Sequence, residues 1–179
     1  MPDVKGERHP SDPRGSESRA APPAGANLLF LREEELRAAQ DLLFFAYRDF
    51  TRAADEVLEK LEMGRAHHRA LHYIGRNPRI PVSDLLAILR ITKQSLARVL
   101  NMLVEDGYVT QQQGEVDRRQ RLLTLTDKGQ ALERQLFDRQ RERLAGAYRD
   151  AGAGAVDGFR RVMRGIMDDE ARAYLDRRG

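Results

Sequence analysis

ITKQSLARVLNMLVEDGYV, residues 91–109, is the stretch that decides the fold, because it predicts a capped amphipathic helix with two unlike faces. Thr92 suits the N-cap, since its hydroxyl can accept a hydrogen bond from the backbone N–H of Gln94 or Ser95. Gly107 stands where a helix commonly ends in a left-handed residue. One stripe at helical spacing is apolar: Leu96, Val99, Leu100 and Leu103. We expect this stripe to be buried.

The opposite face of the same helix carries side chains suited to nucleic acid. These are Lys93, Gln94, Ser95, Arg98 and Asn101. Amide, hydroxyl and guanidinium groups match the donors and acceptors of base edges, and lysine matches phosphate oxygens. We expect Thr92 and Lys93 to hold phosphate and the other four residues to read bases. A polar face is also what any solvated helix shows, so this interpretation depends on the neighbouring segments.

The segments on both sides complete a DNA-binding pattern. A short apolar helix is predicted over about 81–89, and with its brief link to Thr92 it gives the layout of a helix-turn-helix. After Gly107 the period changes to two, which predicts strands over 108–113 and 122–126. Such a hairpin beside a recognition helix is a wing, although an ordinary solvated hairpin shows the same pattern.

The predicted tip of this hairpin, residues 114–121, is rich in arginine. It carries Arg118, Arg119 and Arg121 together with Asp117. An arginine at a wing tip can enter the narrow, electronegative minor groove. We expect Asp117 to hold a neighbouring arginine by a charge-assisted hydrogen bond.

Composition limits the class of protein. The chain has 179 residues, a net charge of +3 and no cysteine, which excludes disulfides, thiolate metal sites and thiol-based oxidant sensing. No apolar run approaches the roughly 18 residues of a membrane span, and no secretory signal opens the chain. A Gly-rich phosphate loop, a nucleophile motif and a convincing metal triad are all lacking in the sequence. We therefore predict a cytoplasmic protein that is not an enzyme, with no cofactor and no membrane partner.

Long helices are predicted on either side of the DNA-binding pattern. The first, over about 32–62, has about 30 residues and runs about 45 Å, which is too long for a small one-sided core. C-terminal helices over about 128–177 break at Ala151–Gly154. Such helices favour a homodimer, with a long intramolecular bundle as the alternative. The predicted boundaries are a disordered extension rich in proline over 1–28, an N-terminal dimerisation helix over 29–62, a winged helix-turn-helix domain over 63–127 and C-terminal dimerisation helices over 128–179.

Two further groups of residues are candidates for ligand binding. His68 and His72 are four residues apart on one predicted helix, a spacing that can ligate a metal but needs a third ligand. The alternative is a pair of half-buried structural imidazoles, and we assign no metal. A small-molecule effector site is predicted near Phe44, Tyr47, Arg48, His68 and His72, although aromatic stripes belong to a core more often than to a pocket.

Several of these motifs together resemble the MarR family of winged-helix transcription regulators. The resemblance covers about residues 30–177 and lies in the order of the helices and in the segments Lys93–Ser95, Leu103–Val109, Asp117–Arg119 and Leu125–Gly129. It implies a homodimer on double-stranded DNA with a palindromic operator, each recognition helix in a major groove and each wing in the flanking minor groove. Arg119 matches the family's wing-tip arginine and Asp117 the acid before it. Many members release DNA when a small, often aromatic molecule binds between the winged helix and the dimerisation helices.

Departures from the family pattern bear on the subtype. The oxidant-sensing branch uses a cysteine, and the zinc-sensing branch uses a site that does not map convincingly onto His67, His68 and His72. We therefore predict a mainly α (α+β) fold, in which a winged helix-turn-helix with a two-stranded β wing is joined to long terminal dimerisation helices. The predicted function is a repressor released by a small-molecule effector. The alternatives are a protein-interaction scaffold that never binds DNA and a metal-responsive regulator using His68 and His72.

Overall fold

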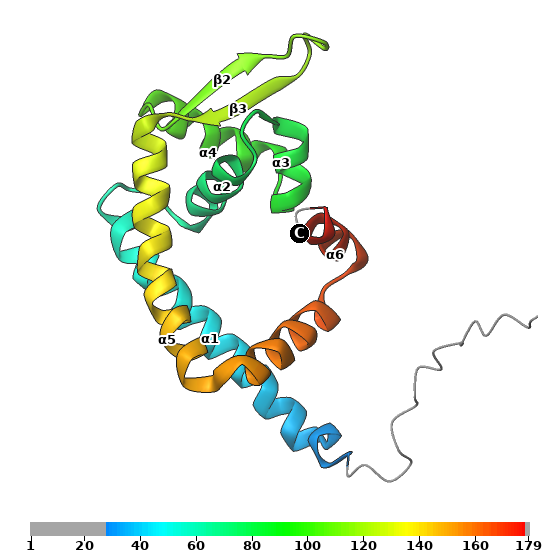
Figure 1. The fold of residues 1–179 in the computed structure, drawn as a ribbon. Coiled ribbons are helices and arrows are strands. Elements are labelled where there is room, and N and C mark those ends of the chain that lie inside the picture. The colour runs from blue at the N-terminus through cyan, green and yellow to red at the C-terminus, as the bar shows by residue number, and fades with distance from the viewer. Residues whose placement is uncertain (1–27, 178–179) are drawn as a thin grey trace, which may run out of the picture. The chain divides into compact units, whose positions relative to one another are not determined.

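The computed structural model describes residues 28–177 and shows a mainly helical fold with one small sheet, as the sequence predicted (Figure 1). The helices are α1 (Glu33–Glu59), α2 (Arg65–Arg76), α3 (Val82–Leu89), α4 (Lys93–Glu105), α5 (Asp127–Ile166) and α6 (Asp169–Asp176). The strands are β1 (Ile80–Pro81), β2 (Val109–Gln113) and β3 (Arg121–Leu125), and a 3-10 turn, η1, covers Leu28–Leu31. The extension predicted over 1–28 lies, except for its last residue, outside the described residues.

The chain divides into two units, Met1–Asp41 and Leu42–Gly179. In the described part of the first unit, η1 leads into the first turns of α1, where Glu33 and Arg37 form an ion pair one helical turn apart. All elements from α2 onward belong to the second unit, which contains the candidate site.

The core of the second unit is formed where α2, α3, α4, the sheet and the start of α5 meet. The predicted stripe of α4 is buried there, since Leu96, Val99, Leu100 and Leu103 are all at most 6% exposed. Leu71 and Ile74 of α2, together with Leu85 of α3, are completely buried in the same cluster. This packing fixes the orientation of α4, because burial of its apolar face in the core leaves the opposite, polar face in solvent.

The sheet has three strands in the order β1–β3–β2, so it contains the predicted two-stranded wing, β2 and β3, and a third strand that the sequence did not predict. All pairs are antiparallel, and Ile80 of β1 lies opposite Leu123 of β3. Two residues cannot show a period of two, so β1 left no signal in the sequence. Its pairing with β3 holds the start of α3 beside the middle of that strand.

The long helices carry exposed apolar side chains. In α5 the predicted break appears as a kink at Gly152, whose φ is 78°. Exposed large apolar residues of the second unit include Leu42, Leu43, Phe44, Phe45 and Tyr47 of α1, and Phe159, Val162 and Ile166 of α5. Within residues 28–177 no helix has the length and apolar character that crossing a membrane demands.

Candidate nucleic-acid interface

The first turn of α4 is fixed by the predicted cap. Thr92 is extended at the N-cap, and its Oγ1 accepts a hydrogen bond from the backbone N–H of Ser95 at 3.1 Å. The same hydroxyl donates to Ser95 Oγ at 2.9 Å. No acidic side chain stands in this turn, so the positive end of the helix dipole is left open to an anion.

Most of the predicted polar residues of α4 are exposed. Lys93, Gln94, Arg98 and Asn101 are all exposed, whereas Ser95 is half-buried beside the cap. Within the part of the chain that the structure describes, the four exposed side chains have no recorded hydrogen-bond or ion-pair partner. They are therefore free to bind a ligand, whereas the hydroxyls of Thr92 and Ser95 already serve the cap.

The hairpin tip is held by its own backbone and by two side chains. The Asp117 carboxylate accepts a hydrogen bond from the backbone N–H of Arg119 at 2.9 Å, so it does hold a neighbouring arginine, but by the main chain rather than by the guanidinium. Gln113 donates its amide N–H to the Arg118 carbonyl at 2.7 Å. A Cβ on Gly114 would lie 2.5 Å from the Asp117 carbonyl oxygen, so this tight turn requires glycine.

The three predicted arginines do not all lie at the tip. Arg118 and Arg119 do, and both are exposed, whereas Arg121 is the first residue of β3 and lies opposite Gln113. Placing Arg121 in the tip segment was therefore wrong, because β3 begins one residue earlier than expected. The β2–β3 hairpin projects beyond α2–α4, which leaves the tip arginines in solvent (Figure 1).

A hollow of about 470 Å³ joins the recognition helix to the hairpin. It is lined by Asn101 of α4 and by Arg119 and Arg121 of the hairpin, so three predicted residues meet there. Ser83 at the start of α3 and Gln111 of β2 also line it, and neither residue was predicted to belong to the interface. A polar residue at the start of the first helix of a helix-turn-helix was the signal that could have revealed Ser83.

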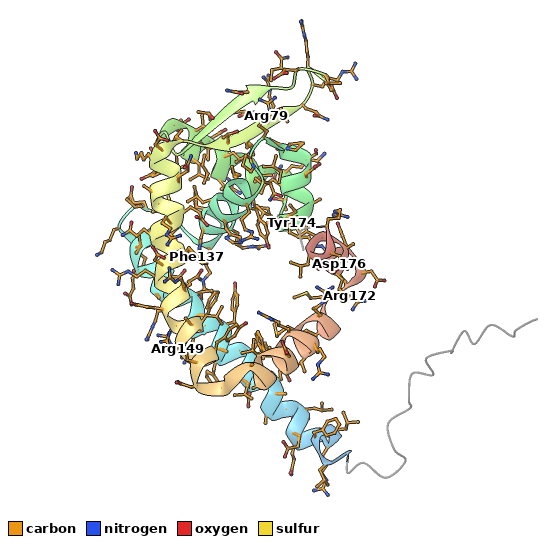
Figure 2. All side chains as sticks on the ribbon, in the orientation of Figure 1. Arg79, Phe137, Arg149, Arg172, Tyr174 and Asp176 are labelled. Atoms are coloured by element: carbon orange, nitrogen blue, oxygen red, sulfur yellow. The ribbon has the colours of Figure 1, made fainter. Side chains whose placement is uncertain are left out.

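One contact at the tip of the hairpin had no sequence signal. Arg79 donates to the Glu115 carboxylate at 2.9 Å, across 36 positions of the chain (Figure 2). Arg79 precedes β1 and has a left-handed backbone with φ of 65°. The pair ties the hairpin to the segment before α3, although both side chains are exposed and the ion pair adds little stability.

Comparison with known proteins places this arrangement in a family. A family profile described as MarR family matches residues 61–120. The HTH-type transcriptional regulator PetP of Rhodobacter capsulatus is 49% identical over 152 residues, covering 85% of this chain and 92% of PetP. The chain belongs to the MarR family.

Further relatives agree with this assignment. The HTH-type transcriptional regulator BilQ of Clostridium symbiosum is 32% identical over 82 residues, which are 46% of this chain and 57% of BilQ. A crystal structure of a cysteine-to-serine mutant of MarR from E. coli, complexed with operator DNA, has a TM-score of 0.59 and 23% identity, and covers 78% of this chain and 99% of that one. A crystal structure of another MarR family transcription regulator has a TM-score of 0.65 and 17% identity, and covers 80% and 92%. These structures establish the fold, and MarR is a family of transcription regulators rather than enzymes.

The residues predicted to bind an effector lie outside the two hollows described for this MarR-family chain. Phe44 and Tyr47 are 63% and 56% exposed. Arg48 pairs with its neighbour Asp49 and lies over the ring of Phe45. Neither the hollow beside the hairpin nor a larger one of about 790 Å³ beside α6 is lined by any of the five predicted residues.

The two predicted histidines lie on α2 where it faces α5. His72 Nδ1 is 3.5 Å from a carboxylate oxygen of Glu133, and its ring contacts that of Tyr73. Burial lowers the pKa of His68, and the nearby His72 lowers it further, while burial raises the pKa of Glu133. Among residues 28–177 no group of three or more His, Asp or Glu side chains is arranged to hold a metal ion.

Proposed function

We propose that this MarR-family regulator is a cytoplasmic homodimer that represses transcription by binding a palindromic operator in double-stranded DNA. The observation that carries the proposal is the exposed, unpaired polar face of α4 beside a hairpin tipped with two exposed arginines. In this arrangement α4 lies in a major groove and the hairpin reaches the flanking minor groove.

The residues divide by role. Gln94, Arg98 and Asn101 read base edges, because their amide and guanidinium groups are exposed and unpaired. Lys93 binds phosphate at the positive end of α4. The hydroxyls of Thr92 and Ser95 contact DNA only with the hydrogen-bonding capacity that their capping bonds do not use. Arg118 and Arg119 enter the minor groove, and Arg121 contacts phosphate from β3. That the related E. coli MarR is complexed with operator DNA supports DNA as the partner.

The homodimer is supported by the apolar surface of the long helices. Phe159, Val162 and Ile166 of α5 are 46%, 65% and 60% exposed, and the exposed aromatic residues of α1 add to this surface. Large apolar side chains that remain exposed in such numbers mark an interface more often than a solvated face. Two copies related by a two-fold axis would present two α4 helices to the two halves of a palindrome.

Release by a small, aromatic effector is the part of the proposal that rests on the family resemblance. A thermal-shift screen of aromatic acids and of divalent metals on the purified protein tests it. A compound that raises the melting temperature and also lowers operator affinity is the expected result. Binding that leaves operator affinity unchanged would contradict it.

The decisive experiment measures binding to the DNA upstream of the gene by fluorescence anisotropy, against random competitor. Gln94→Ala should cost about 1–3 kcal/mol on the operator and little on random DNA, because a base contact is specific. Arg119→Ala should weaken binding. It should also lower the slope of log affinity against log salt concentration by about 1, because the variant neutralises one DNA phosphate fewer. Arg139→Ala, an exposed arginine of α5, removes the same charge and serves as control.

Two outcomes would overturn the proposal. Equal affinity for operator and random DNA would remove sequence-specific repression. A salt-insensitive protein partner with no retention on DNA would favour the interaction scaffold. A reporter gene placed downstream of the operator separates repression from activation. Reporter expression should rise when the gene for this protein is deleted if the protein is a repressor, and fall if it is an activator.

A further inference from the structure

Arg90 has an unusual backbone in the turn of the helix-turn-helix. It ends α3 as the C-cap with φ of 49° and ψ of 46°, a left-handed conformation that glycine adopts without strain and other residues do not. The turn of a helix-turn-helix often contains glycine for this reason. A strained arginine at such a position suggests that its side chain has a use.

The guanidinium of Arg90 is held by two carboxylates from the start of α6. Nη1 donates to Asp168 Oδ2 at 2.6 Å, and Nη2 donates to Glu170, so that residues 78 and 80 positions apart in the chain are joined. Asp168 is also the N-cap of α6, where its other oxygen accepts from the Ala171 N–H at 2.8 Å. That N–H and the guanidinium lower the pKa of Asp168, and the two carboxylates raise that of Arg90. We call these three side chains the Arg90 cluster.

Outside the Arg90 cluster, polar contacts also attach α6 to the end of α5, since Asp176 pairs with Arg164 and Arg172 donates to the Met167 carbonyl at 2.7 Å. The Tyr174 hydroxyl accepts a hydrogen bond from the Asn77 amide at 3.1 Å, and its ring meets that of Tyr73 edge-on (Figure 2). No residue of α6 is buried, and the hollow of about 790 Å³ lies between α6, the end of α2 and one face of α3. With so little apolar packing, the polar contacts at its rim decide whether α6 stays in place.

We propose that Arg90 is a positioning residue for DNA binding, which fastens α6 to the turn of the helix-turn-helix and so fixes the direction in which α4 begins. The inference rests on the proposed function. Thr92, the N-cap of α4, is two residues beyond Arg90, so a change in the turn is passed directly to the recognition helix. If the turn is already held in one conformation, no conformational entropy is lost in ordering it when DNA binds. Arg90 therefore raises affinity without contacting DNA.

The competing role for Arg90 is a phosphate contact of its own, with Asp168 and Glu170 as competitors of the DNA. The two roles predict opposite results when the acids are removed. If the cluster positions the turn, Asp168→Asn with Glu170→Gln must weaken operator binding. If the acids compete with phosphate, the same double variant must strengthen it.

The experiment compares Arg90→Gly with this double variant in the full-length protein. Hydrogen exchange followed by mass spectrometry reports whether α6 is attached, and operator binding at several salt concentrations reports affinity. Both variants should speed exchange in residues 168–177 and lower affinity about fivefold, with an unchanged salt slope because no phosphate contact is lost. Arg90→Lys, which keeps the charge, should recover part of both effects.

Glu62→Gly is the matched control. Glu62 is exposed and left-handed with φ of 56°, so glycine relieves the same kind of strain at a residue that is not part of the Arg90 cluster. Both glycine variants should melt no lower than the parent protein, so lost affinity in Arg90→Gly would not come from unfolding.

Four results would overturn the proposal. Unchanged exchange in Arg90→Gly would show that Arg90 does not hold α6. Faster exchange with unchanged affinity would make the attachment irrelevant to DNA. Tighter binding by the double variant, or a salt slope lowered by about 1 in Arg90→Gly, would identify a phosphate contact instead. If the parent protein shows no preference for operator over random DNA, the proposed function fails and this inference with it, while the exchange data still decide whether the Arg90 cluster holds α6.

Discussion

Single residues of the proposed interface divide into two kinds: we propose that some bind DNA, whereas others fix the backbone that presents them. We assign Gln94 and Arg98 to the first kind, because their side chains are exposed and unpaired. Thr92 and Gly129 belong to the second. A sequence pattern treats both kinds alike, but mutation separates them, since the first changes DNA affinity and the second changes stability.

Thr92→Ala should lower the free energy of unfolding by about 1 kcal/mol, because the Ser95 N–H loses its capping acceptor. Urea denaturation followed by circular dichroism measures it. Lys93→Ala, the next residue along, should leave stability unchanged while lowering the salt slope of DNA binding. Equal stability of Thr92→Ala and the parent protein would show that the cap contributes nothing.

Gly129→Ala should destabilise the protein by about 3 kcal/mol or more, because overpacking against a rigid backbone forces the chain apart. A Cβ at this position would lie 2.0 Å from the Tyr108 carbonyl oxygen, where the start of α5 meets the start of β2. This contact explains the glycine in the motif Leu125–Gly129. Gly64→Ala, with nothing within 4 Å, is the control, and a small effect at Gly129 measured by the same denaturation would contradict the geometry.

At the scale of elements, α2 carries ionisable groups into its junction with α5. His68 is near His72, Asp55 and Glu133, and its pKa is lowered mainly by burial. The unfolded chain therefore binds more protons than the folded chain once the pH falls below the ordinary histidine value of about 6.5. Stability from this group is complete above that value and is lost as the pH falls toward the lowered folded value.

The melting temperature of the parent protein should accordingly fall more between pH 7.5 and pH 5.5 than that of His68→Gln. Differential scanning fluorimetry measures both. The raised pKa of Glu133 acts in the opposite direction at lower pH, and His68 itself lowers that pKa, so the comparison reports His68 together with its interaction with Glu133. Parallel curves for the two proteins would show that burial of His68 does not control its protonation.

At the scale of the whole molecule, the exposed apolar residues of the long helices predict assembly. Val162→Asp places a charge where a side chain that is 65% exposed in one copy would be buried between two. Sedimentation velocity should show a dimer for the parent protein and a smaller species for the variant, because an unpaired buried charge is costly. Gln130→Asp, an exposed polar site on the same helix, should sediment as the parent does. A parent protein that sediments as a monomer at micromolar concentration would end the dimer proposal.

The sequence by itself determined the parts that depend on local periodicity and capping. The stripe of α4, its Thr92 cap, the end at Gly107 and the kink near Gly152 were all predicted, because each depends on residues within a few positions of one another. The family motifs placed the wing and its tip arginines in the same way.

Only the tertiary structure decided the contacts between distant segments. The strand β1 exists because Ile80 pairs with Leu123, and the hairpin is tied to the segment before α3 by Arg79 and Glu115. The attachment of α6 to Arg90 likewise joins positions about 80 residues apart. Such contacts depend on how the core orients the elements, and a short strand or a single ion pair has no periodicity by which a sequence could reveal it.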